Sequence, residues 1–241
     1  MYSFQFGNQT IPYSLSTSHR RKSLSISVDQ YGVSVITPSN ADIKRVEAIL
    51  HKKAVWILKQ LSDYKEMHST AAVEHLFLSG EKLPYLGRQY RLKVIKKDTL
   101  EPSLRFYQGR FIAEVPVDTP EKDYRHLLHP LFVEWVRERA EKYAKDRVKR
   151  FTVKLQLKPN KIMIKDQEQR WGSCTPSGYI LLNWRIFLAP TSIIDYVLAH
   201  ELVHLKQMNH SKEYWDTLRM LLPDYEQRKE WLRKNGRTLD V

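Results

Sequence analysis

The sequence has few of the features that mark secreted, membrane-spanning or disordered chains. Cysteine occurs once, at Cys174, which excludes an intramolecular disulfide. No apolar run is long enough to span a membrane, and the N-terminus lacks the charged-then-apolar form of a signal peptide. Only 8 of the 241 residues are glycine and 42% are hydrophobic, which argues against disorder. We therefore expect a cytoplasmic protein with a substantial hydrophobic core and no membrane partner.

Acidic residues are also scarce relative to basic ones. The chain has 40 Lys and Arg against 27 Asp and Glu, which gives a net charge of +13. Such a surface attracts polyanions and favours nonspecific binding of nucleic acid. The basic residues form only small clusters along the chain, and no known nucleic-acid-binding motif accompanies them. A solvated basic surface is therefore as consistent with the sequence as a dedicated polyanion site.

The hydrophobic pattern predicts an α+β fold with two domains. In residues 1–118, short stretches of alternating apolar residues predict a β-rich region that contains one long helix. In residues 119–241, a long helical stretch is followed by a hairpin of Arg170–Cys174 and Tyr179–Asn183, and then by further helices. No internal repeat is evident in the sequence.

The strongest functional signal is the segment HELVHLKQMNH, from His200 to His210. His200 and His204 are four residues apart, so their imidazoles would lie on one face of a helix. This is the spacing that two neighbouring ligands of one metal ion need. Glu201 follows the first histidine, where its carboxylate can reach a metal-bound water rather than the metal itself.

A third histidine could complete the ligand set. Chance alone gives H-E-x-x-H in roughly two of a hundred chains of this composition, but the added His210 lowers that to below about one in a thousand. Asn209 tolerates the left-handed conformation that ends many helices, and a turn there would bring His210 back toward His204. Three histidines and a water would form a tetrahedral catalytic zinc site.

The residues around this segment predict two helices. Ser192 and Asp195 have the spacing of a capping box at the start of the metal-binding helix. Ser211 is a predicted N-cap of the following helix, and Pro223 is predicted to end it. An apolar helix that carries two histidines is unfavourable unless a partner satisfies them, and a metal ion would do so.

Together these residues resemble the YgjP-like metallopeptidase family, a zincin-type group related to the SprT-like and WLM metalloproteases. The resemblance covers most of the chain, and it is carried by WGSC at Trp171–Cys174, LN at Leu182-Asn183, AP at Ala189-Pro190, HELVH, NHS at Asn209–Ser211, PDY at Pro223–Tyr225 and, more weakly, LPYLGR at Leu83–Arg88. It implies a zincin-like catalytic half, made of a long helix, a small antiparallel sheet and the HExxH helix, together with a β-rich N-terminal region.

The resemblance also implies the roles of the site residues. Zinc would be bound by His200, His204 and His210, and Glu201 would be the catalytic acid and base. The histidine spacing fits the metzincins as well, but Gln207 stands where that group has a glycine, so we do not assign the chain to it.

The expected function is that of a zinc-dependent metallohydrolase, in the first place a metallopeptidase that cleaves a peptide or protein with a zinc-bound water activated by Glu201. The family that this sequence resembles has also been associated with metal-dependent hydrolysis of UTP, so a nucleoside triphosphate pyrophosphatase is an alternative. A third alternative is a DNA-associated SprT-like protease or a nucleic-acid-binding protein, for which the basic surface is the motive.

Two residues are candidates for the donor that stabilises the developing negative charge. Tyr214 lies four residues past His210, and Arg170 lies in the predicted hairpin. Both residue types more often have a structural role at such positions. Trp171 and Cys174 are interpreted as packing residues, because the histidine set already completes the site.

Overall fold

A computed structural model describes residues 2–18, 23–29, 32–39, 42–68, 74–167 and 170–241. The chain divides into two compact units, Met1–Ala71 and Ala72–Val241. The buried hydrophobic side chains form two clusters, one within each unit. Each unit therefore has a core of its own, as independently folding domains do.

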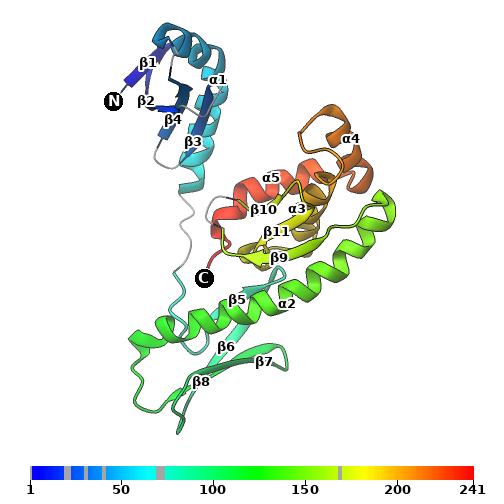
Figure 1. Ribbon diagram of the computed structural model, residues 1–241. Helices are drawn as coiled ribbons and strands as arrows, with labels where there is room; N and C mark the ends of the chain where they lie inside the picture. The colour runs from blue at the N-terminus through cyan, green and yellow to red at the C-terminus, as the bar shows by residue number, and fades with distance from the viewer. Residues whose placement is uncertain (1, 19–22, 30–31, 40–41, 69–73, 168–169) are drawn as a thin grey trace. The chain divides into compact units, whose positions relative to one another are not determined.

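Four strands and one helix make up the first unit (Figure 1): β1 (Tyr2–Phe6), β2 (Gln9–Ser18), β3 (Ser25–Asp29), β4 (Gly32–Pro38) and α1 (Ile43–His68). The sheet order is β1-β2-β4-β3, and the central pair β2 and β4 is parallel while the outer pairs are antiparallel. Buried residues alternate along β4, so one face of the sheet is buried and α1 packs on the sheet.

The second unit begins with the same arrangement: β5 (Lys82–Tyr85), β6 (Arg88–Lys97), β7 (Ser103–Tyr107), β8 (Arg110–Pro116), the short helix η1 (Glu121–Asp123) and α2 (Tyr124–Leu155). Its sheet order is β5-β6-β8-β7, again with a parallel central pair, β6 and β8, between two antiparallel pairs. The helix α2 then continues beyond the sheet into the part of the unit that carries the histidines.

These two ββββα modules are an internal repeat that the sequence analysis missed. Their strands have 5, 10, 5 and 7 residues in the first module and 4, 10, 5 and 7 in the second. Pro38 and Pro116 each end the fourth strand, and Leu50 and Leu128 occupy corresponding positions of the helices.

From the fourth strand into the helix, the buried positions of the two modules correspond at one constant spacing along the chain. The corresponding buried pairs are Val33 and Phe111, Val35 and Ala113, Thr37 and Val115, Val46 and Tyr124, Leu50 and Leu128, Ala54 and Phe132, and Ile57 and Trp135. The pattern of burial is preserved while most residue identities differ, so comparison of the letters alone did not reveal the repeat.

The remaining elements form the part of the second unit that carries the histidines: β9 (Lys161–Lys165), β10 (Gly172–Cys174), β11 (Tyr179–Asn183), η2 (Trp184–Leu188), α3 (Thr191–Val203), α4 (Lys212–Leu221), α5 (Tyr225–Asn235) and η3 (Gly236–Thr238). The sheet order is β10-β11-β9. The predicted hairpin is present as the antiparallel pair β10 and β11, but β9 and β11 are parallel, so the small sheet is mixed rather than antiparallel.

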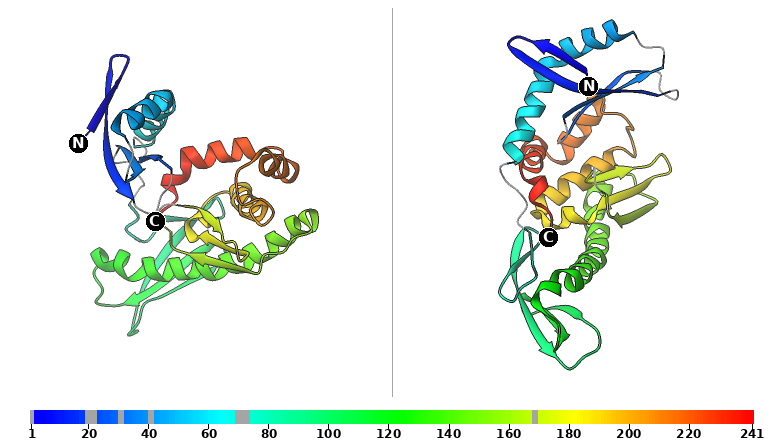
Figure 2. Two further views of the ribbon diagram at one scale, coloured as in Figure 1. Left: turned by 45° about the horizontal axis from the view of Figure 1, so that its top comes forward. Right: turned by 90° about the vertical axis from the view of Figure 1, so that its left-hand side faces the viewer.

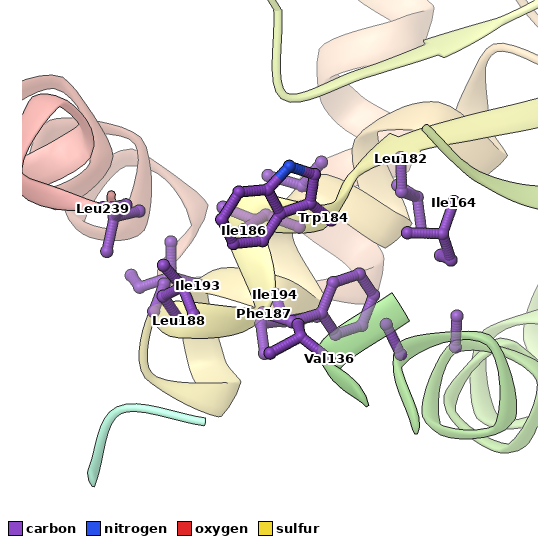
Figure 3. Close-up of a cluster of buried hydrophobic side chains, with 14 of the residues drawn as sticks. Val136, Ile164, Leu182, Trp184, Ile186, Phe187, Leu188, Ile193, Ile194 and Leu239 are labelled. Atoms are coloured by element: carbon purple, nitrogen blue, oxygen red, sulfur yellow. The ribbon is translucent and has the colours of Figure 1, made fainter. Parts of the chain in front are cut away.

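Helix α3 lies between α2 and α5 and packs on both (Figure 2). The side chains of η2 fill the space at the start of α3, where Trp184 and Phe187 are fully buried next to Ile194 and Val136 (Figure 3). This packing fixes the helix that carries His200.

The division between the units differs from the boundary expected after residue 118. Strands β5 to β8 belong to the second unit because their buried side chains share one core with α2 and α3. The turn between β5 and β6 is also hydrogen-bonded to η2. The backbone N–H of Leu86 donates to the carbonyl of Phe187 at 2.8 Å, and that of Gly87 donates to the carbonyl of Leu188 at 3.2 Å. An added Cβ at Gly87 would lie 2.6 Å from Cα of Pro190, so only glycine fits this contact.

The expected fold class, α+β with a β-rich N-terminal region, is confirmed by five α-helices and three small sheets among the described residues. None of the helices in the described part of the chain is long and apolar enough to cross a membrane.

Candidate metal centre

Helix α3 carries the first two histidines, and most of its other residues are buried. Nine of its thirteen residues are buried, including Glu201. The predicted capping box is absent, because Pro190 is the N-cap and Asp195 is engaged elsewhere. Arg147 of α2 donates two hydrogen bonds to the Asp195 carboxylate, at 2.7 and 2.5 Å. The start of α3 is therefore held by an ion pair to α2 rather than by a capping side chain.

The third histidine approaches from the segment between α3 and α4. Helix α3 ends at Val203, with His204 as its C-cap, so the helix is shorter than the sequence suggested. Asn209 is not among the residues with positive φ, so the predicted left-handed cap at that position is wrong. The predicted cap at Ser211 is confirmed, because its hydroxyl accepts a hydrogen bond from the backbone N–H of Tyr214 at 3.4 Å.

The structure brings the three predicted histidines together. The ligand atoms of His200, His204 and His210 all lie within 4.8 Å of one another. Nε2 of His200 and Nε2 of His210 are 3.3 Å apart. Two imidazole nitrogens that bind one zinc ion at about 2.1 Å with a tetrahedral angle would be about 3.4 Å apart. The donor set and its spacing therefore fit a tetrahedral metal ion.

Hydrogen bonding orients one of the imidazoles. Nδ1 of His204 lies 3.0 Å from the carbonyl oxygen of Gln207, to which its N–H donates. Ligand histidines commonly use one ring nitrogen in this way, which leaves the other nitrogen unprotonated and directed at the metal. Gln207, which stands at the position of the metzincin glycine, thus contributes through its backbone.

Burial keeps the imidazole of His200 neutral. The pKa of His200 is lowered to about 3, chiefly because burial disfavours the charged ring, and the charges of His204 and His210 act in the same direction. The pKa of His210 is lowered for the same first reason, with smaller contributions from His204 and Lys229. Neutral imidazole is the form that binds metal ions.

Two aromatic residues of α4 support the histidines. The ring of Tyr214 lies 4.7 Å from the rings of both His204 and His210, and its hydroxyl donates to the backbone carbonyl of His200 at 3.0 Å. Trp215 stacks on His210, with ring centroids 5.4 Å apart and an interplanar angle of 24°. The hydroxyl of Tyr214 is therefore already engaged in bracing α3.

Glu201 directly follows His200 on α3 and is buried. Its side chain is 5% exposed, and burial raises its pKa to about 8, while the charge of Arg170 acts in the opposite direction. Its carboxylate lies against Gly172 of β10, where an added Cβ would be 2.8 Å from Oε1. Arg170 itself is exposed, two residues before the start of β10, and its charge is close enough to act on Glu201.

The other two residues considered from the sequence lie in packing positions. Trp171 is partly buried, and its indole contacts Gly236 so closely that an added Cβ there would lie 2.8 Å from it. Cys174 is partly buried in β10, and burial raises the pKa of its thiol. A raised pKa lowers the thiolate fraction at neutral pH, which fits a structural role for Cys174.

Sequence reasoning missed two residues that contact the site. Gly172 lies against the Glu201 carboxylate, and a glycine in the interior of a predicted strand is a signal of such close approach. Trp215 stacks on His210, and only its position five residues after that histidine could have indicated the contact.

Comparisons with known proteins give two matches. A family model described as "YgjP-like, metallopeptidase domain" matches residues 22–235. Among solved structures, the chain is similar to the crystal structure of the metallopeptidase zymogen of Pyrococcus abyssi abylysin. The identity is 20% and the TM-score 0.36, over 39% of this chain and 96% of that chain. No curated protein matches the sequence.

Proposed function

The chain belongs to the YgjP-like metallopeptidase family, and from that premise we propose that it hydrolyses peptide bonds with a zinc ion held by His200, His204 and His210. One observation carries the proposal: three imidazoles converge, and the residue after the first of them is a buried glutamate, Glu201. When bound, zinc acts as a Lewis acid and lowers the pKa of water toward about 7.

Glu201 would move the proton in this reaction. Because the charge of a bound zinc ion would lower the raised pKa of Glu201, its side chain would be a carboxylate in the loaded site. It would accept the proton of the attacking water and then return it to the leaving amine. Two features of the chain prepare it for this work. Gly172 leaves room for the carboxylate against β10, and burial keeps bulk water from competing for the proton.

We assign the stabilisation of the developing anion to Arg170 rather than Tyr214. The Tyr214 hydroxyl already donates to the carbonyl of His200, whereas the exposed guanidinium of Arg170 lies close enough to influence Glu201. Arg170→Gln is expected to lower kcat by about 10- to 100-fold without loss of zinc, since it removes one donor to the transition state.

Strand β10 supports an extended peptide as the substrate. It is the edge strand of its sheet and packs against α3. An extended peptide that added to this edge would gain backbone hydrogen bonds, and its scissile carbonyl would lie beside the histidines.

The test compares matched variants on a fluorescently labelled unfolded protein such as casein. Glu201→Gln should retain zinc but lose about 100-fold or more in turnover, whereas Glu134→Gln on the exposed surface of α2 should change neither. His204→Ala should lose zinc, while His126→Ala, also exposed on α2, should keep it. Zinc content equal in His204→Ala and the parent protein would overturn the proposed ligand set.

Phosphate release from UTP tests the alternative activity. A rate that depends on zinc and falls in Glu201→Gln, with no cleavage of casein by the parent protein, would replace the peptidase proposal with a pyrophosphatase. Equal release by the parent protein and Glu201→Gln would identify a contaminating enzyme.

A further inference from the structure

A cleft opens between α4 and α5, next to the histidines. It encloses about 630 Å³, a size typical of ligand sites. The residues that line it include two aromatics, Trp215 and Tyr225, and two lysines, Lys212 and Lys229. None of the residues assigned above to metal binding or proton transfer lines it, so the cleft is separate from the centre and adjoins it.

Trp215 forms the wall that the cleft and the metal centre share. One stacking contact joins Trp215 to Tyr225 inside the cleft, at 5.6 Å and 23°. A second joins it to His210, at 5.4 Å and 24°, and its ring centroid is 6.4 Å from that of His200. A substrate bound at the histidines would therefore reach the cleft within one or two residues of the bond that is cut.

The acidic groups of the cleft are already paired. Asp216 and Glu226 each lie within 4 Å of Arg219, at 3.7 and 3.4 Å. Glu230 accepts from Arg233 at 2.8 Å. These pairs leave the arginines with little capacity for a ligand.

The two lysines of the cleft differ from its arginines in their pairing. Among the ion pairs of the described residues, neither Lys212 nor Lys229 has a carboxylate partner, although the cleft contains three carboxylates. Nζ of Lys229 lies 5.0 Å from the centroid of Trp215. Two lysines without a recorded carboxylate partner thus line a partly apolar cleft, which is a setting for an anionic ligand.

We propose that this cleft is a substrate subsite, in which Lys212 and Lys229 bind a carboxylate of the peptide and the rings of Trp215 and Tyr225 contact its hydrocarbon part. The inference rests on the proposed peptidase function and adds a substrate class to it. The carboxylate belongs either to an Asp or Glu side chain close to the scissile bond or to a free C-terminus.

Cleavage of a peptide library, followed by mass spectrometry of the new termini, tests the subsite. The zinc-loaded parent protein should cleave peptides with a carboxylate at one fixed position in preference to their amide counterparts. Lys212→Gln combined with Lys229→Gln should reduce that preference by about 10-fold, the scale of one or two charged hydrogen bonds. Lys229→Glu should reverse it in favour of Lys or Arg. A library with amidated C-termini separates the sources, because only side-chain recognition survives amidation.

Lys234→Gln is the matched control. Lys234 also lies on α5, but it pairs with Glu230 at 3.5 Å and does not line the cleft, so its loss should leave the preference unchanged. Zinc affinity, measured by competition with a chelator, should not fall in Lys229→Gln, since a repelling charge is removed.

The outcomes separate the two proposals. Cleavage without a preference for carboxylates, or a preference that survives loss of both lysines, overturns the subsite and leaves the peptidase intact. Absence of any zinc-dependent cleavage by the parent protein overturns the peptidase function and the subsite with it.

Discussion

The two ββββα modules follow the same path, yet they are used differently. In the first module, an added Cβ at Gly7, in the turn between the first two strands, would meet no atom within 4 Å. In the second, Gly87 of the corresponding turn lies in close contact with Pro190, the N-cap of α3. The outer face of α2 also packs on α3. The same topology thus forms a separate unit in the first module and supports the candidate metal centre in the second.

The comparison shows which contacts the second module makes in addition to those of the first. The buried positions of its helix match those of the first module, as Leu128 matches Leu50. The packing of helix on sheet is therefore alike in the two modules. The added contacts come from the turn between β5 and β6 and from α2, which packs on η2, α3 and β9. Variants at matched positions of the two modules should therefore differ in their effects where the second module makes these added contacts.

Truncation of the matched leucines should have the largest effects. Leu128→Ala and Leu50→Ala each remove a fully buried side chain and should each cost about 2–5 kcal/mol. Only Leu128→Ala should also reduce zinc retention, because it weakens the unit that holds the histidines. Urea unfolding followed by hydrogen exchange would assign each loss to its unit. Loss of zinc in Leu50→Ala would show that the two modules are not separate folding units.

Alanine substitutions in the two corresponding turns should distinguish the modules by the size of the stability loss. Gly87→Ala combines an unfavourable positive φ with a clash against Pro190, and should cost about 2–4 kcal/mol. Gly7→Ala has the positive φ alone and should cost about 1–2 kcal/mol. Thermal unfolding of both variants measures the difference, and equal losses would remove the case for docking through this turn.

Metal removal should affect one module only. Zinc at a hundredfold excess over its Kd stabilises the folded state by about 2.7 kcal/mol. A chelator should therefore lower the stability of Ala72–Val241 and leave that of Met1–Ala71 unchanged. His204→Ala serves as the control, because a chelator should no longer change its unfolding.

A glycine beside the Glu201 carboxylate should affect activity more than stability. Gly172→Ala places a methyl group 2.8 Å from the Glu201 carboxylate, whose side chain can shift to relieve the contact. We expect turnover to fall by about 10- to 100-fold, the scale of a displaced general base, with zinc retained. Ser173→Ala in the same strand is the matched control. Unchanged turnover in Gly172→Ala would mean that the position of Glu201 is not critical.

The smallest effect concerns two tryptophans. Trp215→Leu removes the stack on His210 and should weaken zinc binding by about 3- to 10-fold, while Trp215→Phe should restore most of it. Trp56→Leu on α1, 43% exposed, should change zinc affinity not at all. Chelator competition measures all three, and equal affinities would assign Trp215 to packing alone.

The strands, the long helices and the histidine helix could be predicted because each depends on local spacing. Alternating apolar residues specify strands, and the four-residue spacing of His200 and His204 specifies one face of α3. Ser211 caps α4 through a contact with its own neighbours, which local pattern also captures.

The features that sequence reasoning missed depend on contacts between distant segments. The capping box failed because Asp195 binds Arg147, and Gly172 could not be matched to Glu201 before β10 was placed beside α3. The parallel pairing of β9 and β11 depends on how the chain crosses over, which the alternation within each strand does not record. The domain boundary shifted for the same reason, through the hydrogen bond between Leu86 and Phe187.

The hydrogen bonds from the turn between β5 and β6 to η2 also govern when the metal centre can form. During synthesis, the first module and then the second emerge and can fold while His200 is still unmade. The hydrogen bonds from Leu86 and Gly87 can form only after Phe187 and Leu188 have been synthesised, and they close a long loop of the chain. A chain released early therefore carries both sheets but no assembled hydrolytic site.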